Sequence, residues 1–402
     1  MKLPALLLIS ALGLTCPPCF ADARDFGEGT QNFSEPSKLD NTNGSRDHWN
    51  GIGRLSVEGS VCTATLIDNR DDTSPLLTPA YVLTAGHCID HSNGKIITNK
   101  PISGSMTFNY FTDGNKNKSY PLKQVKWRSM QGVDMAIVEL NVSMHRLSRD
   151  GIQPLKVARV MPPEGSNVLI VGAAQYSTLQ MSACTLQPAS DVIEGRWTWR
   201  NNFMTQCKGV GAGISGSPLL DRYTNEIIGV IGTGNDDSSL TPCEINAPCT
   251  PTENGYQAIA GNVYGNPANI IKSCFRNGVM AETPAECRLY PTFSIAIEDD
   301  ALQQPKVIKT TSNGETVPPT WNFKFSIDTD LYRHKTVRTA KDCENRSDYS
   351  GLVRSTLTVI DTEIGSQPGR YFLCILGMSR GQDFSLGLLR NALSVPIVLT
   401  DR

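Results

Sequence analysis

The sequence has 402 residues, more than one ordinary domain holds, so we expect two or three domains. Hydrophobic residues make up 39% of it and charged residues 19%, which fits folded domains with apolar cores. The formal net charge is only −2, so the charge balance does not favour nucleic acid or an anionic membrane as a partner.

The first residues are typical of a secretory signal peptide. Met1-Lys2 precedes an apolar run from Leu3 to Thr15, and Ala21-Asp22-Ala23 offers a cleavage site between small residues. The apolar run is too short to span a bilayer, and no later stretch is long enough. We therefore expect residues 1–23 to be removed, and the mature protein to be secreted or periplasmic with no membrane span.

Residues 24–48 are rich in Asp, Asn, Ser, Gly and Thr and contain few apolar residues. Such a composition buries too little apolar surface to fix its own structure. It predicts a flexible N-terminal extension or a short propeptide.

Two segments of the first half place a polar residue beside an apolar strand. Residues 81–88 read Y-V-L-T-A-G-H-C, a strand that runs into a small-residue turn presenting His87. Residues 132–140 read G-V-D-M-A-I-V-E-L and place Asp134 directly before another strand. Taken singly, a core histidine and a strand-terminal aspartate without a special role are both common.

A third segment surrounds a serine with glycines. Residues 211–220 read G-A-G-I-S-G-S-P-L-L, with Ser215 at the centre. Gly213 can adopt backbone conformations that are closed to residues with a Cβ, which would let its N–H point at a substrate carbonyl. Taken alone, this stretch is equally consistent with a plain turn.

Together the three segments resemble the trypsin/chymotrypsin-like serine peptidases in residue type, local setting and the chain order His, Asp, Ser. The T-A-G-H-C motif is highly specific, and G-x-S-G-S-P is moderately so. The resemblance covers residues 49–287 and implies an all-β fold. We expect two six-stranded antiparallel β-barrels over residues 49–150 and 160–265, closed by a C-terminal helix over 266–277.

The resemblance also implies an activity, that of an exported serine endopeptidase acting on proteins or peptides without a cofactor. Ser215 would be the nucleophile of an acyl-enzyme mechanism, with His87 as general base and Asp134 orienting the imidazole. The N–H groups of Gly213 and Ser215 would form the oxyanion hole.

The family likewise supplies a substrate-binding strand and a disulfide. Gly232, Thr233 and Gly234 would form one wall of the S1 pocket, beside a strand whose backbone pairs with an extended substrate. Cys62 and Cys88 correspond to the cystine that joins the histidine loop to its neighbouring strand.

Ten cysteines remain after the signal peptide, and an even number in an exported protein predicts as many as five disulfides. The alternative is metal binding. The mature sequence has no C-x-x-C pair and the chain only five histidines, so we expect no metal site.

The sequence departs from the family pattern in two places. No Ile-Val-Gly-Gly-like start precedes the first barrel, and Ile214 takes the place of the aspartate that pairs with the new amine in many members. We therefore expect a site that forms without this ion pair, as in members resembling glutamyl endopeptidases. The histidine that those enzymes use is absent, with Val230 and Ile231 in its region, so glutamyl specificity is unsupported.

The preference for the residue before the cleaved bond stays open. An acidic pair, Asp236 and Asp237, would favour Lys or Arg if it lies near S1, although acids in loops are usually solvated. Trp197 and Trp199 are expected in the core rather than in a pocket, and His91 is expected on the surface.

Residues 288–402 lie outside the resemblance. Residues 293–298 and 321–328 alternate apolar and polar side chains, which predicts a small C-terminal β-sandwich. Cys343 and Cys374 are candidates for its internal bridge. The sequence leaves open whether this domain binds a substrate, a surface ligand or the peptidase domain.

Two other classes of function compete with the peptidase. One is a non-catalytic binding module that kept the motif by descent, and the complete set of three candidate residues argues against it. The other is an adhesin in which the C-terminal domain carries the main function.

Overall fold

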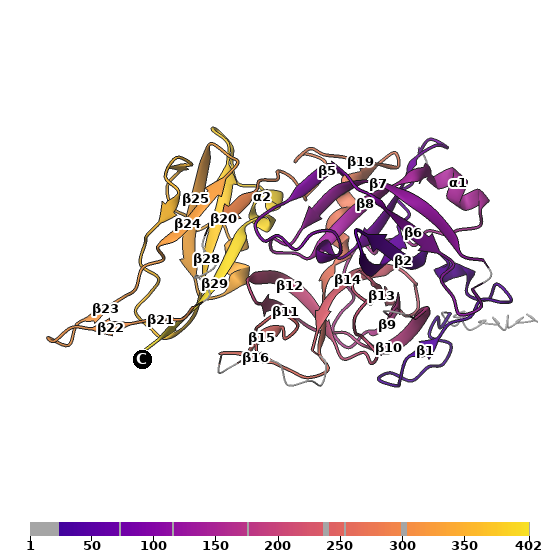
Figure 1. The fold of residues 1–402 in the computed structure, drawn as a ribbon, viewed down its shortest axis with the longest axis horizontal. Helices are drawn as coiled ribbons and strands as arrows, with labels where there is room; N and C mark the ends of the chain where they lie inside the picture. The colour runs from indigo at the N-terminus through magenta and orange to yellow at the C-terminus, as the bar shows by residue number, and fades with distance from the viewer. Residues whose placement is uncertain are drawn as a thin grey trace, which may run out of the picture.

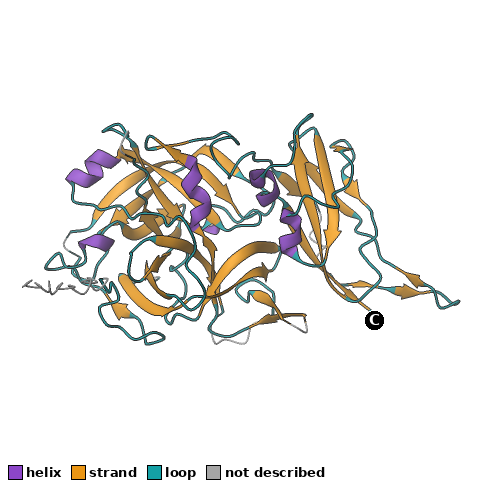
Figure 2. Ribbon diagram, turned by 180° about the vertical axis from the view of Figure 1, so that it is seen from behind, coloured by secondary structure: helices purple, strands orange, loops and turns teal. Residues whose placement is uncertain are grey.

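The computed structural model describes residues 24–71, 74–114, 116–174, 177–235, 241–252, 255–298 and 304–401. The expected signal peptide and the acidic pair Asp236 and Asp237 lie outside these residues. The described chain is mostly β-strand, with two sheets stacked in one part and a separate pair of sheets formed by the C-terminal residues (Figures 1 and 2). None of the helices in the described residues is long and apolar enough to cross a membrane.

The first sheet closes on itself. Its order is β5-β7-β6-β2-β3-β4-β8, and β7 also pairs with β8, so six antiparallel strands form a closed barrel with β5 attached outside it. The strands are β2 Ile52–Val57, β3 Ser60–Leu66, β4 Pro79–Thr84, β5 Ile97–Pro101, β6 Gly104–Phe108, β7 Lys118–Ser129 and β8 Met135–Ser143. The apolar side chains of these strands fill the barrel, and this confirms the first expected barrel.

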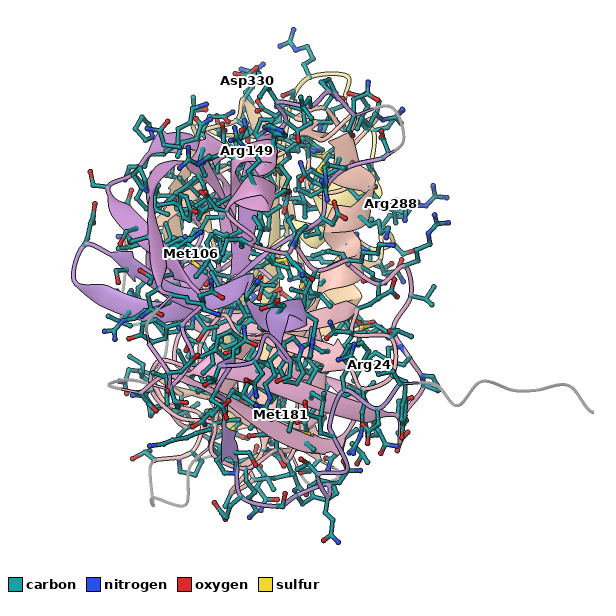
Figure 3. The ribbon with its side chains drawn as sticks, turned by 90° about the vertical axis from the view of Figure 1, so that its right-hand side faces the viewer. Arg24, Met106, Arg149, Met181, Arg288 and Asp330 are labelled. Carbon is teal, nitrogen blue, oxygen red and sulfur yellow. A yellow bond between two sulfur atoms is a disulfide. The ribbon has the colours of Figure 1, made fainter. Side chains whose placement is uncertain are left out.

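The second sheet has ten strands in the order β1-β10-β9-β13-β14-β17-β12-β11-β15-β16. They are β1 Ser37–Lys38, β9 Asn167–Ala173, β10 Leu179–Thr185, β11 Gln187–Glu194, β12 Trp197–Thr205, β13 Pro218–Asp221, β14 Ile227–Gly234, β15 Cys249–Thr252, β16 Gly255–Ala258 and β17 Val263–Pro267. The six strands from β10 to β12 correspond to the second expected barrel, and β1 and β11-β15-β16 extend it at the two edges. Figure 3 shows the two sheets stacked, with Met106 of β6 above and Met181 of β10 below.

The helices in the described part of the chain are few and short. They are η1 Asp47–Trp49, η2 Gly86–Cys88, α1 Met144–Arg149, η3 Ala268–Cys274, η5 Ala340–Glu344 and α2 Leu386–Arg390, and a small hairpin of β18 Phe275–Arg276 and β19 Val279–Met280 follows η3. The closing helix expected over 266–277 is therefore the shorter 3-10 helix η3. It starts late because Asn266 and Pro267 still belong to β17, where they pair with β14.

Residues 24–48, expected to be a flexible extension or a short propeptide, contact the rest of the described chain at several points. Asp25 forms a bidentate ion pair with Arg222, with both N–O distances below 3 Å, and β1 adds to the edge of β10. Leu39 is buried in the main hydrophobic cluster. These contacts join the segment to residues far along the chain.

The C-terminal residues form two sheets around a core of their own, the expected β-sandwich. One sheet has the order β21-β29-β28-β25-β26 and the other β20-β24-β27, while β22 and β23 form a projecting hairpin (Figure 1). The strands are β20 Ile295–Ile297, β21 Lys306–Val307, β22 Lys309–Thr310, β23 Thr316–Val317, β24 Phe323–Ile327, β25 Leu331–Val337, β26 Val353–Arg354, β27 Val359–Ile360, β28 Gly369–Met378 and β29 Leu393–Thr400. In β24 the side chains of Phe323 and Phe325 are buried while Lys324 and Ser326 are exposed. The apolar–polar alternation of the sequence thus matches the buried and exposed faces of the strand.

Candidate active site

Two neighbouring strands of the first barrel bring His87 and Asp134 together. His87 lies in the turn η2 that follows β4, and Asp134 lies directly before β8. These strands are paired, with Thr84 opposite Ala136, so the residues just beyond the pairing meet at one end. His87 Nδ1 is 2.7 Å from Asp134 Oδ2, and the His87 backbone N–H donates to Asp134 Oδ1 at 2.9 Å. The aspartate thus fixes both the ring and the backbone of the histidine.

The carboxylate of Asp134 is fully buried and closely surrounded. A Cβ on Gly86 would lie 2.2 Å from the Ser129 carbonyl oxygen, and a Cβ on Gly232 would lie 2.9 Å from Asp134 Oδ2. Both distances are shorter than non-bonded contacts allow, so these positions require glycine. Gly232, expected as part of a pocket wall, therefore also makes room for the aspartate.

Arg128, on β7, holds the loop that carries His87, and sequence reasoning missed it. Its side chain is fully buried and donates to the carbonyl oxygens of Gly86 at 3.2 Å and of Lys95 at 2.9 Å. It also donates to the carbonyl oxygens of Asp90 and Ser92. These bonds satisfy loop carbonyls that would otherwise be buried without partners. The strand pattern around Arg128 gives no signal of this role.

Ser215 lies in a turn that is bonded to both sheets. Its carbonyl oxygen accepts the Thr63 N–H of β3 at 2.9 Å, and the Gly216 N–H donates to the Ile231 carbonyl of β14 at 2.8 Å. Gly213 has a φ of +88°, which L-residues with a Cβ rarely adopt, so the turn requires glycine there. Neither the Gly213 N–H nor the Ser215 N–H donates to another described residue, so both are available to a ligand.

A cavity of about 510 Å³ joins these groups. His87 and Ser215 both line it, as do the predicted wall residues Gly232, Thr233 and Gly234. Among the described residues no hydrogen bond joins the Ser215 hydroxyl to His87, and catalytic hydrogen bonds in ligand-free sites are often long. A larger cavity of about 610 Å³ lies where the loop 92–95 meets β20, and it contains none of these five residues.

Burial and mutual attraction shift the two titrating groups in opposite directions. Burial alone would lower the pKa of His87, but the charge of Asp134 and its hydrogen bond raise it above the ordinary 6.5. Burial alone would raise the pKa of Asp134, but the charge of His87 and its two hydrogen bonds hold it below the ordinary value. The pair therefore combines a carboxylate whose pKa is lowered with a histidine whose pKa is raised, and each group favours the charged form of the other.

Three aromatic residues lie closer to the site than the sequence predicted. Trp197 and Trp199 are buried but line the cavity, and their rings stack at a centroid distance of 6.4 Å. His91 is exposed as expected, yet its ring lies 5.8 Å from that of His87 and also lines the cavity. The hairpin of β11 and β12 carries the tryptophans to this position, which propensity alone does not reveal.

All ten described cysteines are paired. The disulfides are Cys62–Cys88, Cys184–Cys207, Cys243–Cys249, Cys274–Cys287 and Cys343–Cys374, and the first and last are the pairs considered from the sequence. The sulfurs of Cys62 and Cys88 lie close to the His87 ring. Because they are bonded to each other, this group, the one cluster of its kind in the described part of the chain, offers no thiolate ligands to a metal.

The fold and the site define a class: a β protein in which a buried carboxylate–histidine pair and a glycine-flanked serine share one cavity. Residues 62–230 match the family model described as the trypsin-like peptidase domain. Residues 62–230 thus belong to a trypsin-like serine peptidase domain, and a domain of this kind acts on proteins or peptides. No curated protein matches the sequence.

Solved structures with a similar chain include the Rv3671c protease from M. tuberculosis in its active form, a Glu endopeptidase in complex with MPD, and the protease Anisep from Arthrobacter nicotinovorans. The sequence identities are 16%, 18% and 15%, and the TM-scores are 0.36, 0.37 and 0.35. The matches cover 60%, 58% and 54% of this chain and 86%, 90% and 90% of those proteins. Each match therefore leaves at least two fifths of this chain without a counterpart.

Proposed function

We propose that the protein is an exported serine endopeptidase that cleaves peptide bonds through His87, Asp134 and Ser215. The observation that carries the proposal is the His87–Asp134 pair, bonded at 2.7 Å, facing a cavity that Ser215 also lines. A serine hydroxyl is a weak nucleophile near neutral pH without an adjacent base, and histidine titrates in the range such a base needs.

In this mechanism Ser215 Oγ attacks the carbonyl carbon of the peptide while His87 Nε2 accepts the hydroxyl proton. Asp134 accepts the Nδ1–H of His87, which leaves Nε2 free as the base and stabilises the imidazolium. The C–N bond then breaks as His87 returns the proton to the leaving amine. Water attacks the acyl-enzyme by the same steps and frees Ser215.

The remaining parts of the site stabilise charge and hold the substrate. The available N–H groups of Gly213 and Ser215 would bind the oxyanion, and losing one such donor typically costs about 2.7–4 kcal/mol. Residues 232–234 at the end of β14 would pair with the backbone of an extended substrate.

The five disulfides support export, because disulfides persist in oxidising compartments such as the periplasm or the extracellular space. We assign residues 49–287 to the peptidase domain and 288–402 to the C-terminal sandwich. Clusters of buried residues in the two parts support this division.

Covalent labelling with a serine-directed phosphonate tests the proposal. The probe should label the protein at Ser215, and both the Ser215→Ala and His87→Ala variants should lose the label because the nucleophile or its base is missing. Labelling that persists in Ser215→Ala would place the nucleophile elsewhere. A folded protein that takes up no probe would instead support the non-catalytic binding module.

The activity should also depend on pH in a defined direction. Neutral His87 is the base, so kcat/KM should rise with pH, with a midpoint above 6.5 because the pKa of His87 is raised. The variant Asp134→Asn should move this midpoint to lower pH, since the carboxylate that raises the pKa is gone. Steady-state rates from pH 5 to 9 for both proteins measure the shift, and an unchanged midpoint would contradict the assigned pair.

A further inference from the structure

A buried acid in the cavity has no place in the mechanism above. Glu194 is the last residue of β11, opposite Trp197 in the hairpin with β12. It is only 6% exposed, and it lines the same cavity as Ser215 and His87. A carboxylate that is nine-tenths buried and borders a ligand-sized space requires an explanation.

The two oxygens of Glu194 have different surroundings. Oε1 accepts the backbone N–H of Asn246 at 2.8 Å. Oε2 is buried and has no hydrogen-bond partner among the described residues. No described lysine or arginine forms an ion pair with Glu194. One oxygen of a buried acid is thus left for something that enters the cavity.

The scaffold keeps the carboxylate in place rather than leaving it mobile. The short loop closed by Cys243–Cys249 lies over the hairpin, because the Gly195 N–H donates to the Cys243 carbonyl at 2.8 Å. The same loop supplies the Asn246 N–H, and Cys249 pairs with Ile193. A disulfide therefore fixes the loop against the acid, so the site is preorganised.

The cavity suits a long cationic side chain. Trp197 and Trp199 offer apolar walls against which the methylene stem of Lys or Arg can pack while its charged end reaches the acid. Burying an unpaired carboxylate is costly, and a cation that hydrogen-bonds to it removes that cost. Burial raises the pKa of Glu194, as expected of a buried carboxylate that has no ion-pair partner in the described part of the chain.

We propose that Glu194 determines specificity by binding the Lys or Arg side chain of the residue just before the cleaved bond. The proposal rests on the peptidase function argued above. Glu194 and Thr233 line the same cavity, and Thr233 lies in the stretch predicted to border S1, so the acid faces the space that this side chain would enter.

Matched peptides test this directly. The wild-type protein should cleave after Lys and Arg in preference to norleucine, which has a similar length and no charge. In Glu194→Gln, which keeps an oxygen for the Asn246 N–H, the ratio of kcat/KM for Lys over norleucine should fall by ~100-fold or more.

Asp191→Asn is the control, since Asp191 is equally buried on β11 but bonds to the backbone N–H groups of Asn201 and Lys341 instead. Its ratio should stay as in the wild type.

A binding experiment separates this proposal from the catalytic one. Calorimetry with benzamidine and the Ser215→Ala variant needs no turnover, and binding should be lost when Glu194→Gln is added. Binding should strengthen as pH rises above about 4.5, the ordinary pKa of this acid, because only the ionised carboxylate attracts the cation. Cleavage and phosphonate labelling without any preference for Lys or Arg would overturn the role of Glu194 and leave the peptidase intact. Equal loss of the ratio in Asp191→Asn would also overturn it.

Discussion

Replacing Ser215 by alanine should abolish peptidase activity while leaving the fold intact. We expect kcat to fall by a factor on the order of 10⁵ or more, because without the hydroxyl no acyl-enzyme can form and only the oxyanion donors and substrate binding remain. The backbone hydrogen bonds of the turn, from Thr63 to the Ser215 carbonyl and from Gly216 to Ile231, do not involve the side chain. Hydrolysis of a peptide library, quantified by mass spectrometry, measures the loss.

Ser217→Ala provides a matched control two residues away. The Ser217 hydroxyl is fully buried and has no hydrogen-bond partner in the described part of the chain, so removing it breaks no bond. Its activity should stay within a few-fold of the wild type. If Ser215→Ala kept comparable turnover, or if the two variants lost activity equally, the assignment of the nucleophile would be wrong.

The three candidate catalytic residues could be proposed from sequence because each lies in a short local motif. His87 follows an apolar strand within T-A-G-H-C, and Ser215 lies between glycines that the turn requires. The resemblance that these motifs carry also implied the closed first barrel, and the apolar–polar alternation predicted the two faces of β24. Local sequence carries this information because a strand's two faces and a turn's backbone angles depend on a few adjacent residues.

The residues that the sequence did not reveal act through partners far along the chain. Glu194 ends an ordinary-looking strand, and its partner Asn246 lies 52 residues later. Asp25 pairs with Arg222 across 197 residues and so joins the polar extension to the second sheet. Burial of these groups follows from how the sheets pack, and no periodicity or motif in one sequence encodes that packing.

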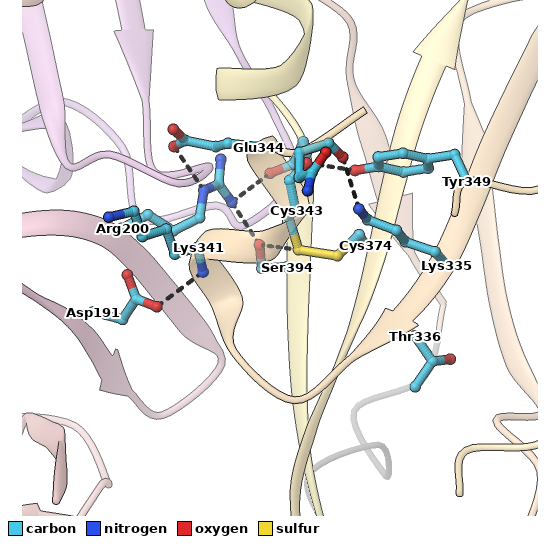
Figure 4. Close-up of a disulfide and its surroundings, with 12 residues drawn as sticks. Asp191, Arg200, Lys335, Thr336, Lys341, Cys343, Glu344, Tyr349, Cys374 and Ser394 are labelled. Atoms are coloured by element: carbon cyan, nitrogen blue, oxygen red, sulfur yellow. Dashed lines mark hydrogen bonds and ion pairs between the residues drawn. A yellow bond between two sulfur atoms is a disulfide. The ribbon is translucent and has the colours of Figure 1, made fainter. Parts of the chain in front are cut away.

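The contact between the two domains also depends on a residue whose partners lie far along the chain. Arg200, on β12 of the second sheet, reaches into the C-terminal domain with a fully buried side chain (Figure 4). It donates to the carbonyl oxygens of Ala392 at 3.0 Å and Arg390 at 2.6 Å, and to Ser394 Oγ at 2.5 Å. Its Nε is 3.1 Å from Glu344 Oε1.

Arg200 also links this interface to the active site. Its backbone N–H donates to the carbonyl of Gly132, two residues before Asp134, at 2.9 Å. The preceding residue, Trp199, lines the cavity. Arg200 points to the other face of β12, because successive side chains of a strand alternate between its two faces. One strand thus carries a cavity wall on one face and the domain contact on the other.

Arg200→Ala should therefore lower the free energy of unfolding by about 3–5 kcal/mol, because it leaves several buried carbonyl acceptors without a partner and removes the ion pair with Glu344. We expect the single unfolding transition of the wild type to split in two as the domains uncouple, and kcat/KM to fall as β12 loosens beside Asp134.

Arg276→Ala is the control: Arg276 pairs with Glu286 at 3.5 Å on the surface, where such a pair contributes no more than about 1 kcal/mol. Urea unfolding followed by circular dichroism and calorimetry compares the two. If both variants showed equally small changes in the free energy of unfolding, the domains would hold together without Arg200. If Arg200→Ala were destabilised but kept full activity, the domain interface would not affect the cavity.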